Sequence, residues 1–152
     1  MLGDLVYPYP SGPHITAMMR ANKRADTKPE AAIRSALHAH GHRFRKDYFV
    51  KTDHASVHVD IAFPRRRLAV FVDGCFWHCC PDHYQVPTAN RQYWEPKLAR
   101  NVARDTLVNR SLAAAGWNVV RLWEHSPVEA AVANVETALS GRSVPAKGLR
   151  LE

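Results

Sequence analysis

The spacing of apolar residues first predicts a helix that begins near residue 28. Residues 27–30, with the sequence TKPE, have the pattern of a capping box with a proline in the first turn. Ile33 and Leu37 follow at helical spacing. Gly41 is expected to end this helix, because glycine readily adopts the backbone conformation that follows a helix.

Alternating and continuous apolar segments predict the strands. Residues 42–50 can form a first strand, and apolar residues alternate with a more polar second face from Val57 to Phe63. Residues 64–67, PRRR, indicate a turn. The sequence LAVFV at residues 68–72 is a continuous apolar run of the kind found in central strands, and residues 118–123 form another.

Two more helices complete the predicted pattern. One is expected to start near Glu95-Pro96 and to stop at Gly116. The sequence SPVE at residues 126–129 is a second capping-box pattern, which predicts a last helix to about Leu139. Helices and strands in this order predict an α/β protein with a single domain, in which helices flank a mixed central β-sheet.

The two ends of the chain differ from this middle part. Residues 1–17 contain several prolines and show no period, so they are predicted to form a flexible N-terminal arm. Residues 18–140 are predicted to form the domain and residues 141–152 a disordered tail. The chain has 152 residues, of which 46% are hydrophobic, and this is enough for one sizeable core.

The charge of the chain favours a polyanionic partner. There are 21 Lys and Arg against 14 Asp and Glu, which gives a net charge of +7. Basic side chains near phosphates release condensed counterions, so nucleic acid is a candidate partner, although the same charge can serve solubility alone. No apolar run approaches the roughly 18 residues of a membrane helix, and the first residues lack the order of a signal peptide. We therefore expect a cytoplasmic protein without a membrane partner.

Acidic residues at the ends of two predicted strands form the first candidate site. The turn at residues 64–67 folds one strand back beside the other, which brings Asp60 near Val72 and Asp73. Two carboxylates and a backbone carbonyl at a strand end suit Mg²⁺, which prefers oxygen ligands. The alternative is that Asp60 is an ordinary solvated strand residue.

Cysteine and histidine residues in the following loop predict a zinc site. The three cysteines, Cys75, Cys79 and Cys80, fall within six residues, which is unlike a disulfide framework. Cys75, Cys80 and His83 have the tight spacing of zinc ligands, and His125 is the nearest candidate for the fourth position. Thiolate and imidazole together select zinc over magnesium. Cys79 can replace Cys80 in this set, and a chance cluster is the alternative.

The same loop carries a histidine and aromatic residues that a zinc site alone does not explain. The spacing of His78 fits a ligand less well, so this imidazole is free to act as a general base near neutral pH. Phe76, Trp77 and Trp94 lie in polar surroundings, where their rings can stack on bases or wedge between them. Alternatively, these rings pack in a small core over the zinc site.

Two acidic residues on predicted helices allow a structural and a catalytic interpretation. Glu30 completes the capping box with Thr27, which alone explains its presence, although it can also lie near the metal. Asp105 follows Arg104 and can form half of an ion pair on the helix surface.

Several motifs together resemble one family of nucleases. In order and spacing, they match the very short patch repair (Vsr) mismatch endonucleases from about Arg20 to His125. The matching segments are DTKPE at residues 26–30, FVDGCFWH at 71–78, CPDH at 80–83, YW at 93–94, NVARD at 101–105, GW at 116–117 and WEH at 123–125. The sequence GCFWH at residues 74–78 is the most specific part.

The resemblance implies a fold similar to type II restriction endonucleases and an activity on double-stranded DNA. It implies hydrolysis of one phosphodiester bond 5′ to the thymine of a T·G mismatch, which arises when 5-methylcytosine deaminates. Mg²⁺ on Asp60 and the Val72 carbonyl would serve catalysis, and zinc on Cys75, Cys80, His83 and His125 would hold the loop. The protein is expected to act as a monomer.

The resemblance also implies roles for the acidic residues and the histidine. Asp60 resembles the magnesium-binding aspartate of the family, and His78 resembles the histidine that activates water. Asp105 resembles the acidic residue that orients this histidine, and Glu30 falls on a residue near the active site. Asp73 belongs to the same candidate catalytic set, although some members of the family carry a second histidine in its place.

The DNA contacts that the resemblance implies lie on both sides of the duplex. Phe76, Trp77 and Trp94 fall on aromatic residues that insert beside the mismatch, and Met19 and Arg20 fall on an arm that grips the duplex from the opposite side. Two other functions remain as alternatives. One is a restriction-type, site-specific endonuclease on the same scaffold, and the other is a non-catalytic zinc module that binds DNA.

Overall fold

A four-stranded mixed sheet forms the centre of the protein. The computed structural model describes residues 25–85 and 87–141, so Met19, Arg20, the expected arm and nearly all of the expected tail lie outside the described residues. The strands are β1 (Arg45–Lys51), β2 (Ser56–Phe63), β3 (Leu68–Asp73) and β4 (Asn118–Trp123), and they lie in this order across the sheet. β2 is antiparallel to both β1 and β3, whereas β4 is parallel to β3.

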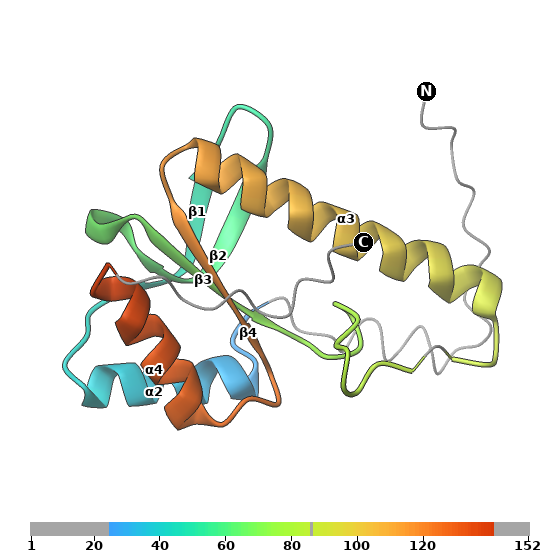
Figure 1. Cartoon of the computed structure of the whole chain (residues 1–152), viewed down its shortest axis with the longest axis horizontal. Coiled ribbons are helices and arrows are strands. Elements are labelled where there is room, and N and C mark those ends of the chain that lie inside the picture. The colour runs from blue at the N-terminus through green and yellow to red at the C-terminus, as the bar shows by residue number, and fades with distance from the viewer. Residues whose placement is uncertain (1–24, 86, 142–152) are drawn as a thin grey trace.

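Helices cover both faces of this sheet (Figure 1). The long α3 (Arg91–Ala114) crosses one face, and α2 (Lys28–Ala39) and α4 (Val128–Leu139) lie side by side on the other. The short 3-10 helix η1 (Pro64–Arg66) forms the turn between β2 and β3. This arrangement confirms the predicted α/β fold with a mixed sheet between helices. Among the described residues, no helix is both long and apolar enough to cross a membrane.

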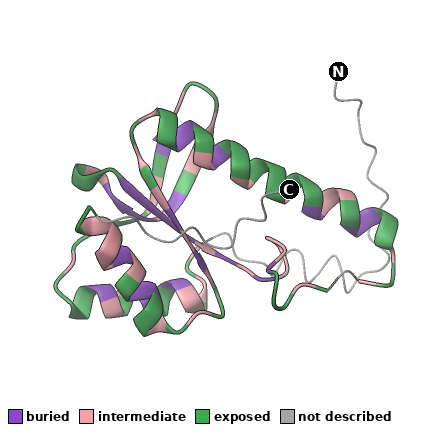
Figure 2. Ribbon diagram, in the orientation of Figure 1, coloured by how far each residue is buried: buried purple, intermediate pink, exposed green. Residues whose placement is uncertain are grey.

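Each face of the sheet has its own hydrophobic core, and the central strands are buried on both sides (Figure 2). The core beneath α2 and α4 includes Leu37, Ile61, Leu68, Val70, Val120, Leu122, Val132 and Val135. The core beneath α3 includes Val50, Val59, Ala62, Ala69, Phe71, Val108 and Leu112. Odd-numbered residues of β3 and β4 therefore face α3 and even-numbered ones face α2 and α4, because strand side chains alternate.

The first predicted helix is capped as its sequence indicates. The Thr27 side chain accepts a hydrogen bond from the backbone N–H of Glu30, at 3.4 Å. The Glu30 carboxylate accepts the backbone N–H of Asp26, one residue before the cap, at 2.9 Å. Gly41 follows the helix with φ +87°, and Gly116 follows α3 with φ +85°. Both glycines therefore end helices in the left-handed region, as predicted.

The predicted start of the long helix and the predicted cap of the last helix are wrong. α3 begins at Arg91 rather than near Glu95, and Pro96 lies inside its second turn. The proline is tolerated because the carbonyl that loses its partner, that of Gln92, belongs to an exposed residue that water can reach. α4 begins at Val128 after Pro127, without a side-chain capping bond.

The strand that carries Asp60 changes face at this residue. The alternation of apolar residues predicts one common face from Val57 to Phe63, yet Ile61 packs under α2 and α4 whereas Val59 packs under α3. The register with β1 is the same on both sides of Asp60, with Lys46 opposite Ile61 and Tyr48 opposite Val59. Asp47, between Lys46 and Tyr48 on β1, has φ +47°, so the break in alternation lies beside a residue with left-handed backbone.

Candidate active site and metal centre

A cleft of about 870 Å³ lies where β2 and β3 diverge. The pairing of these strands ends at Ile61 and Val70, so the segments beyond them separate. The cleft is bounded by α3 on one side and by the loop after β3 on another. All five residues of the candidate catalytic set line it, namely Glu30, Asp60, Asp73, His78 and Asp105.

Asp60 occupies the gap between the two strands. Its Oδ2 accepts the backbone N–H of Val72 at 2.8 Å, which confirms the predicted proximity of these residues. The pKa of Asp60 is raised to about 7, chiefly by burial and to a smaller extent by Glu30 and Asp73, against the lowering by the Val72 N–H and by Arg121. The ionised carboxylate is thus short of compensating positive charge, which makes it a suitable ligand for a divalent cation.

His78 and Asp105 form a close pair in the same cleft. Nδ1 of His78 lies 2.5 Å from Oδ2 of Asp105, and both side chains are largely buried. An ionised carboxylate can only accept, so Nδ1 carries the proton in this pair and Nε2 of the neutral ring is left as an acceptor. Asp105 therefore contacts His78 inside the cleft, and the alternative of an ion pair with Arg104 on the helix surface is not what the structure shows.

Arg121 on β4 completes the site, and the sequence interpretation missed it. Its Nη1 lies 2.9 and 3.1 Å from the two oxygens of Asp73 and 3.3 Å from Oδ1 of Asp105. Its Nε donates to Oδ1 of Asn109 at 2.7 Å, and its guanidinium carbon lies 4.4 Å from the centre of the Phe71 ring. An arginine within an otherwise apolar predicted strand was the available signal, since such a residue needs partners when buried.

Glu30 joins the fold to the site. It is 3% exposed, and its Oε2 accepts from Nη1 of Arg34 at 3.3 Å as well as from the capping N–H of Asp26. Its side chain also lines the cleft near Asp60. The structure therefore supports both interpretations of this residue, since it caps α2 and adds negative charge beside the aspartate.

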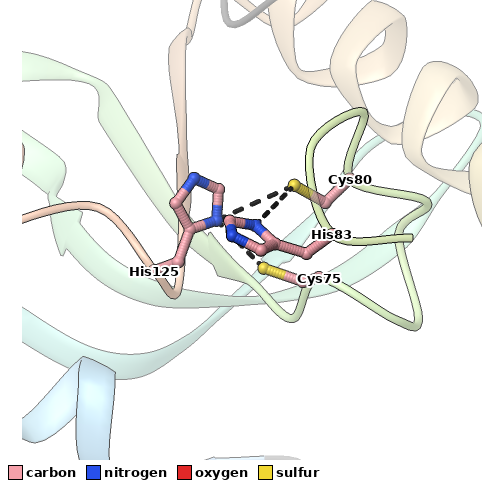
Figure 3. A group of neighbouring side chains, drawn as sticks. All are labelled: Cys75, Cys80, His83 and His125. Atoms are coloured by element: carbon pink, nitrogen blue, oxygen red, sulfur yellow. Dashed lines mark hydrogen bonds between the residues drawn. The ribbon is translucent and has the colours of Figure 1, made fainter. Parts of the chain in front are cut away.

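Four cysteine and histidine side chains converge beside the cleft, as Figure 3 shows. One ligand atom from each lies within 4.8 Å of the others, and the four residues are Cys75, Cys80, His83 and His125. Sγ of Cys80 lies 3.6 Å from Nδ1 of His83 and 3.7 Å from Nδ1 of His125. Tetrahedral zinc with ordinary bond lengths places sulfur and nitrogen ligands about 3.6 Å apart. The donor types and these two distances fit zinc, whereas Sγ of Cys75 lies closer to Nδ1 of His125, at 3.0 Å.

The geometry of this group indicates which of two adjacent cysteines belongs to it. Cys80, and not Cys79, belongs to the converging set. Cys79 adopts φ +54° and interacts with the Tyr84 side chain, and burial raises the pKa of its thiol. The pKa of Cys75 is raised to about 11, chiefly by burial and also by the neighbouring Cys80 thiol. A metal bound here would have to displace the thiol proton, because the thiolate is the form that binds a metal.

Aromatic residues pack between the zinc-type group and α3. Phe76 and Trp77 are half-buried, and their ring centres lie 5.0 Å apart. Trp94 is 3% exposed and lies against both. Nζ of Lys97 lies 5.6 Å from the centre of the Trp77 ring, and Asn101 donates to the Trp77 carbonyl at 3.2 Å. Trp94 therefore supports the other two rings in this structure, and its insertion into DNA stays a prediction.

A four-stranded mixed sheet with helices on both faces (Figure 1) is consistent with the fold of restriction-endonuclease-like nucleases. Comparison with known proteins agrees. The profile of the family described as DNA mismatch endonuclease Vsr matches residues 14–84. The type II nicking enzyme V.NaeI of Lentzea aerocolonigenes is 53% identical over 134 residues, which cover 88% of this chain and 81% of that protein.

Two further relatives are similar over a smaller part of the chain. The type II nicking enzyme V.XorIIP of Xanthomonas oryzae pv. oryzae is 42% identical, over 70% of this chain and 76% of that protein. DNA mismatch endonuclease Vsr of Escherichia coli K12 is 32% identical, over 70% of this chain and 66% of that protein. The chain belongs to the Vsr family, and it is a DNA endonuclease.

Proposed function

We propose that this protein nicks one strand of double-stranded DNA 5′ to the thymine of a T·G mismatch. The observation that carries the proposal is the pairing of His78 with Asp105 in the cleft that Asp60 also lines. A general base and a metal-binding carboxylate in one cleft suit hydrolysis of a phosphodiester bound there. The names of the relatives, which are nicking enzymes and a mismatch endonuclease, support the substrate.

Asp60 and the backbone beside it would bind the metal. Asp60 and the Val72 carbonyl would hold Mg²⁺, and the buried, poorly compensated carboxylate of Asp60 fits that role. Mg²⁺ in this position supplies positive charge that stabilises the charge developing on the phosphate and the leaving oxygen. Glu30 contributes further negative charge near Asp60.

The pair of His78 and Asp105 would take the proton from the attacking water. Asp105 holds Nδ1–H of His78, so Nε2 takes a proton from the attacking water. The resulting imidazolium is stabilised by the same carboxylate, as the buried acid of a catalytic triad stabilises its histidine. The zinc group would keep the loop of residues 74–85 rigid, so that His78 and the aromatic residues keep their positions.

Recognition of the mismatch would rest on the aromatic cluster together with the N-terminal arm. Phe76 and Trp77 present partly exposed rings beside the cleft, with Trp94 behind them. Met19 and Arg20, outside the described residues, would act from the opposite side of the duplex. The enzyme would work as a monomer, because a single nick needs only one active site. It would act in the cytoplasm.

Two substitutions test the catalytic assignment. Asp60→Ala and His78→Ala should each lower the nicking rate on a labelled T·G duplex with Mg²⁺ by about 10²-fold or more, since general acid–base catalysis alone contributes about 10²–10⁴-fold. Binding to the same duplex should survive in both variants, because neither residue is assigned to DNA affinity. A T·A duplex serves as the substrate control. Wild-type turnover by either variant, or equal cutting of both duplexes, would refute the proposal.

A further inference from the structure

We infer that Arg121 is a positioning residue that keeps His78 bonded to Asp105 by holding Asp73 away from it. This inference rests on the proposed function, because it concerns the histidine assigned there as the base. Arg121 lies on β4, directly opposite Phe71 in the parallel register with β3. Asp73 is two residues beyond Phe71, so all three side chains share the face that α3 covers.

Nδ1 of His78 faces two carboxylates, and only one of them can orient it productively. It lies 2.5 Å from Asp105 and 3.9 Å from Oδ1 of Asp73. A rotation of the ring or a small shift of Asp73 would exchange the partners. Asp73 is 3% exposed, so water cannot replace whatever neutralises it.

Arg121 resolves this competition through its contacts. It contacts both oxygens of Asp73 and the oxygen of Asp105 that His78 does not use. The guanidinium is itself fixed, because Asn109 accepts from Nε and the Phe71 ring lies beneath it. Its side chain is 11% exposed, and a planar fork with several donors suits three fixed acceptors better than a lysine would.

The same contacts divide the acidic residues of the cleft into two groups. Asp73, His78 and Asp105 lie close enough together to resemble a metal site, yet the Arg121 guanidinium already contacts both carboxylates. A second cation there would meet a fixed positive charge. Glu30 pairs with Arg34, so Asp60 is left as the carboxylate of the cleft for which the described residues provide no direct guanidinium contact. Because Asp73 is held by Arg121, its role is to position the neighbouring side chains rather than to bind a metal.

Arg121→Met tests this, because it removes the charge and keeps an unbranched apolar stem over Phe71. We expect the nicking kcat to fall about 10- to 100-fold, the usual effect of losing a partner that orients an active-site ligand, while KM for the duplex changes less than about threefold. Arg121→Lys restores the charge without the fork and should recover only part of the rate. Arg110→Met, an exposed arginine of α3, is the control for net charge and should nick normally.

A double variant separates positioning from a purely structural role. Without Arg121, the Asp73 carboxylate competes for Nδ1–H, so adding Asp73→Asn should raise the rate of Arg121→Met about tenfold. A variant that is simply misfolded would not recover in this way. The inference is overturned if Arg121→Met nicks at the wild-type rate, or if the double variant is as slow as the single one or slower.

A measurement without substrate keeps this test independent of the proposed function. The Nδ1–H proton of His78, assigned by its absence in His78→Ala, should give a protected, downfield resonance in the wild type because its bond to Asp105 is short. Arg121→Met should shift or broaden it, and Arg110→Met should leave it unchanged. An unchanged resonance in Arg121→Met overturns the inference even if no DNA is nicked. Failure of the wild type to nick T·G duplexes would overturn only the proposed function.

Discussion

At the scale of single residues, Asp60 illustrates how an active site is built at the expense of stability. Its carboxylate titrates near 3.8 in an unfolded chain, and burial raises the pKa to about 7 in the folded protein. Between these pH values the folded protein keeps a proton that the unfolded chain has released. The free energy of unfolding of the metal-free protein therefore falls as pH rises through this window, and this contribution levels off above about pH 7.

Asp60→Asn should remove this dependence. The amide oxygen can still accept the Val72 N–H, but it carries no charge, so the metal-free variant should exceed the wild type in stability by about 2–4 kcal/mol at pH 8 and by little at pH 4. Denaturant unfolding in EDTA at both pH values measures this. Mg²⁺ should narrow the difference at pH 8, because it binds the ionised wild-type side chain. A pH-independent difference between the two proteins would contradict the assigned pKa.

The residues of the site also show what a sequence can predict. Asp60, His78 and Asp105 were found because their residue types and motif positions are informative on their own. Arg121 was not, because its partners come from the end of β3 and from α3, and their meeting depends on strand register and helix position. A residue whose role is defined by three acceptors on two other elements cannot be recognised from its own neighbours in the chain.

At the scale of elements, the loop after β3 has little regular structure of its own. Its backbone is held by a few bonds, such as Cys80 N–H to the Cys75 carbonyl at 2.9 Å, and by Glu124, whose Oε1 accepts the Cys75 N–H at 2.9 Å. Glu124 was also missed by the sequence analysis. A metal held by the four-ligand group would add a tie between this loop and His125, beside the contacts of its aromatic residues with α3.

Adjacent cysteines provide a matched test of the zinc site. Elemental analysis should find zinc in the wild-type protein and none in Cys80→Ser. The thermal midpoint of Cys80→Ser should be lower by more than about 5 °C, because a lost structural metal costs folding free energy. Cys79→Ser should keep both, since Cys79 lies outside the ligand group. EDTA should reduce the midpoint of the wild type toward that of Cys80→Ser. Zinc-free wild-type protein, or equal behaviour of the two variants, would contradict the ligand set.

Element boundaries were predictable where side chains alone decide them. The capping box at Thr27 and the glycines that follow α2 and α3 act locally, and they were correctly identified. The start of α3 was misplaced because Tyr93 and Trp94 pack into the aromatic cluster and so extend the helix before Pro96. The change of face at Asp60 was missed because the irregular backbone belongs to the neighbouring strand, β1.

At the scale of the whole molecule, the order of elements was enough to predict the fold, since continuous apolar runs mark β3 and β4 as central strands with helices on both sides.

The whole molecule also separates two contributions to DNA binding. The net charge of +7 attracts phosphates whatever the sequence, and this attraction weakens with salt. The aromatic cluster occupies one place beside the cleft, where the proposed contact with a particular base pair would be made.

Trp77→Ala should therefore change the selectivity of the protein and leave its salt dependence intact. A T·G pair is more easily unstacked than a T·A pair, so a ring that enters the stack penalises normal pairs more. The variant should bind T·G duplex more weakly by about 1–3 kcal/mol and should prefer it less over T·A, with the same slope of affinity against salt concentration. Phe49→Ala, which removes an exposed ring on the edge strand β1, should bind both duplexes like the wild type. If Trp77→Ala retains full preference, or if its thermal midpoint collapses, the ring belongs to the core of the loop and does not read the mismatch.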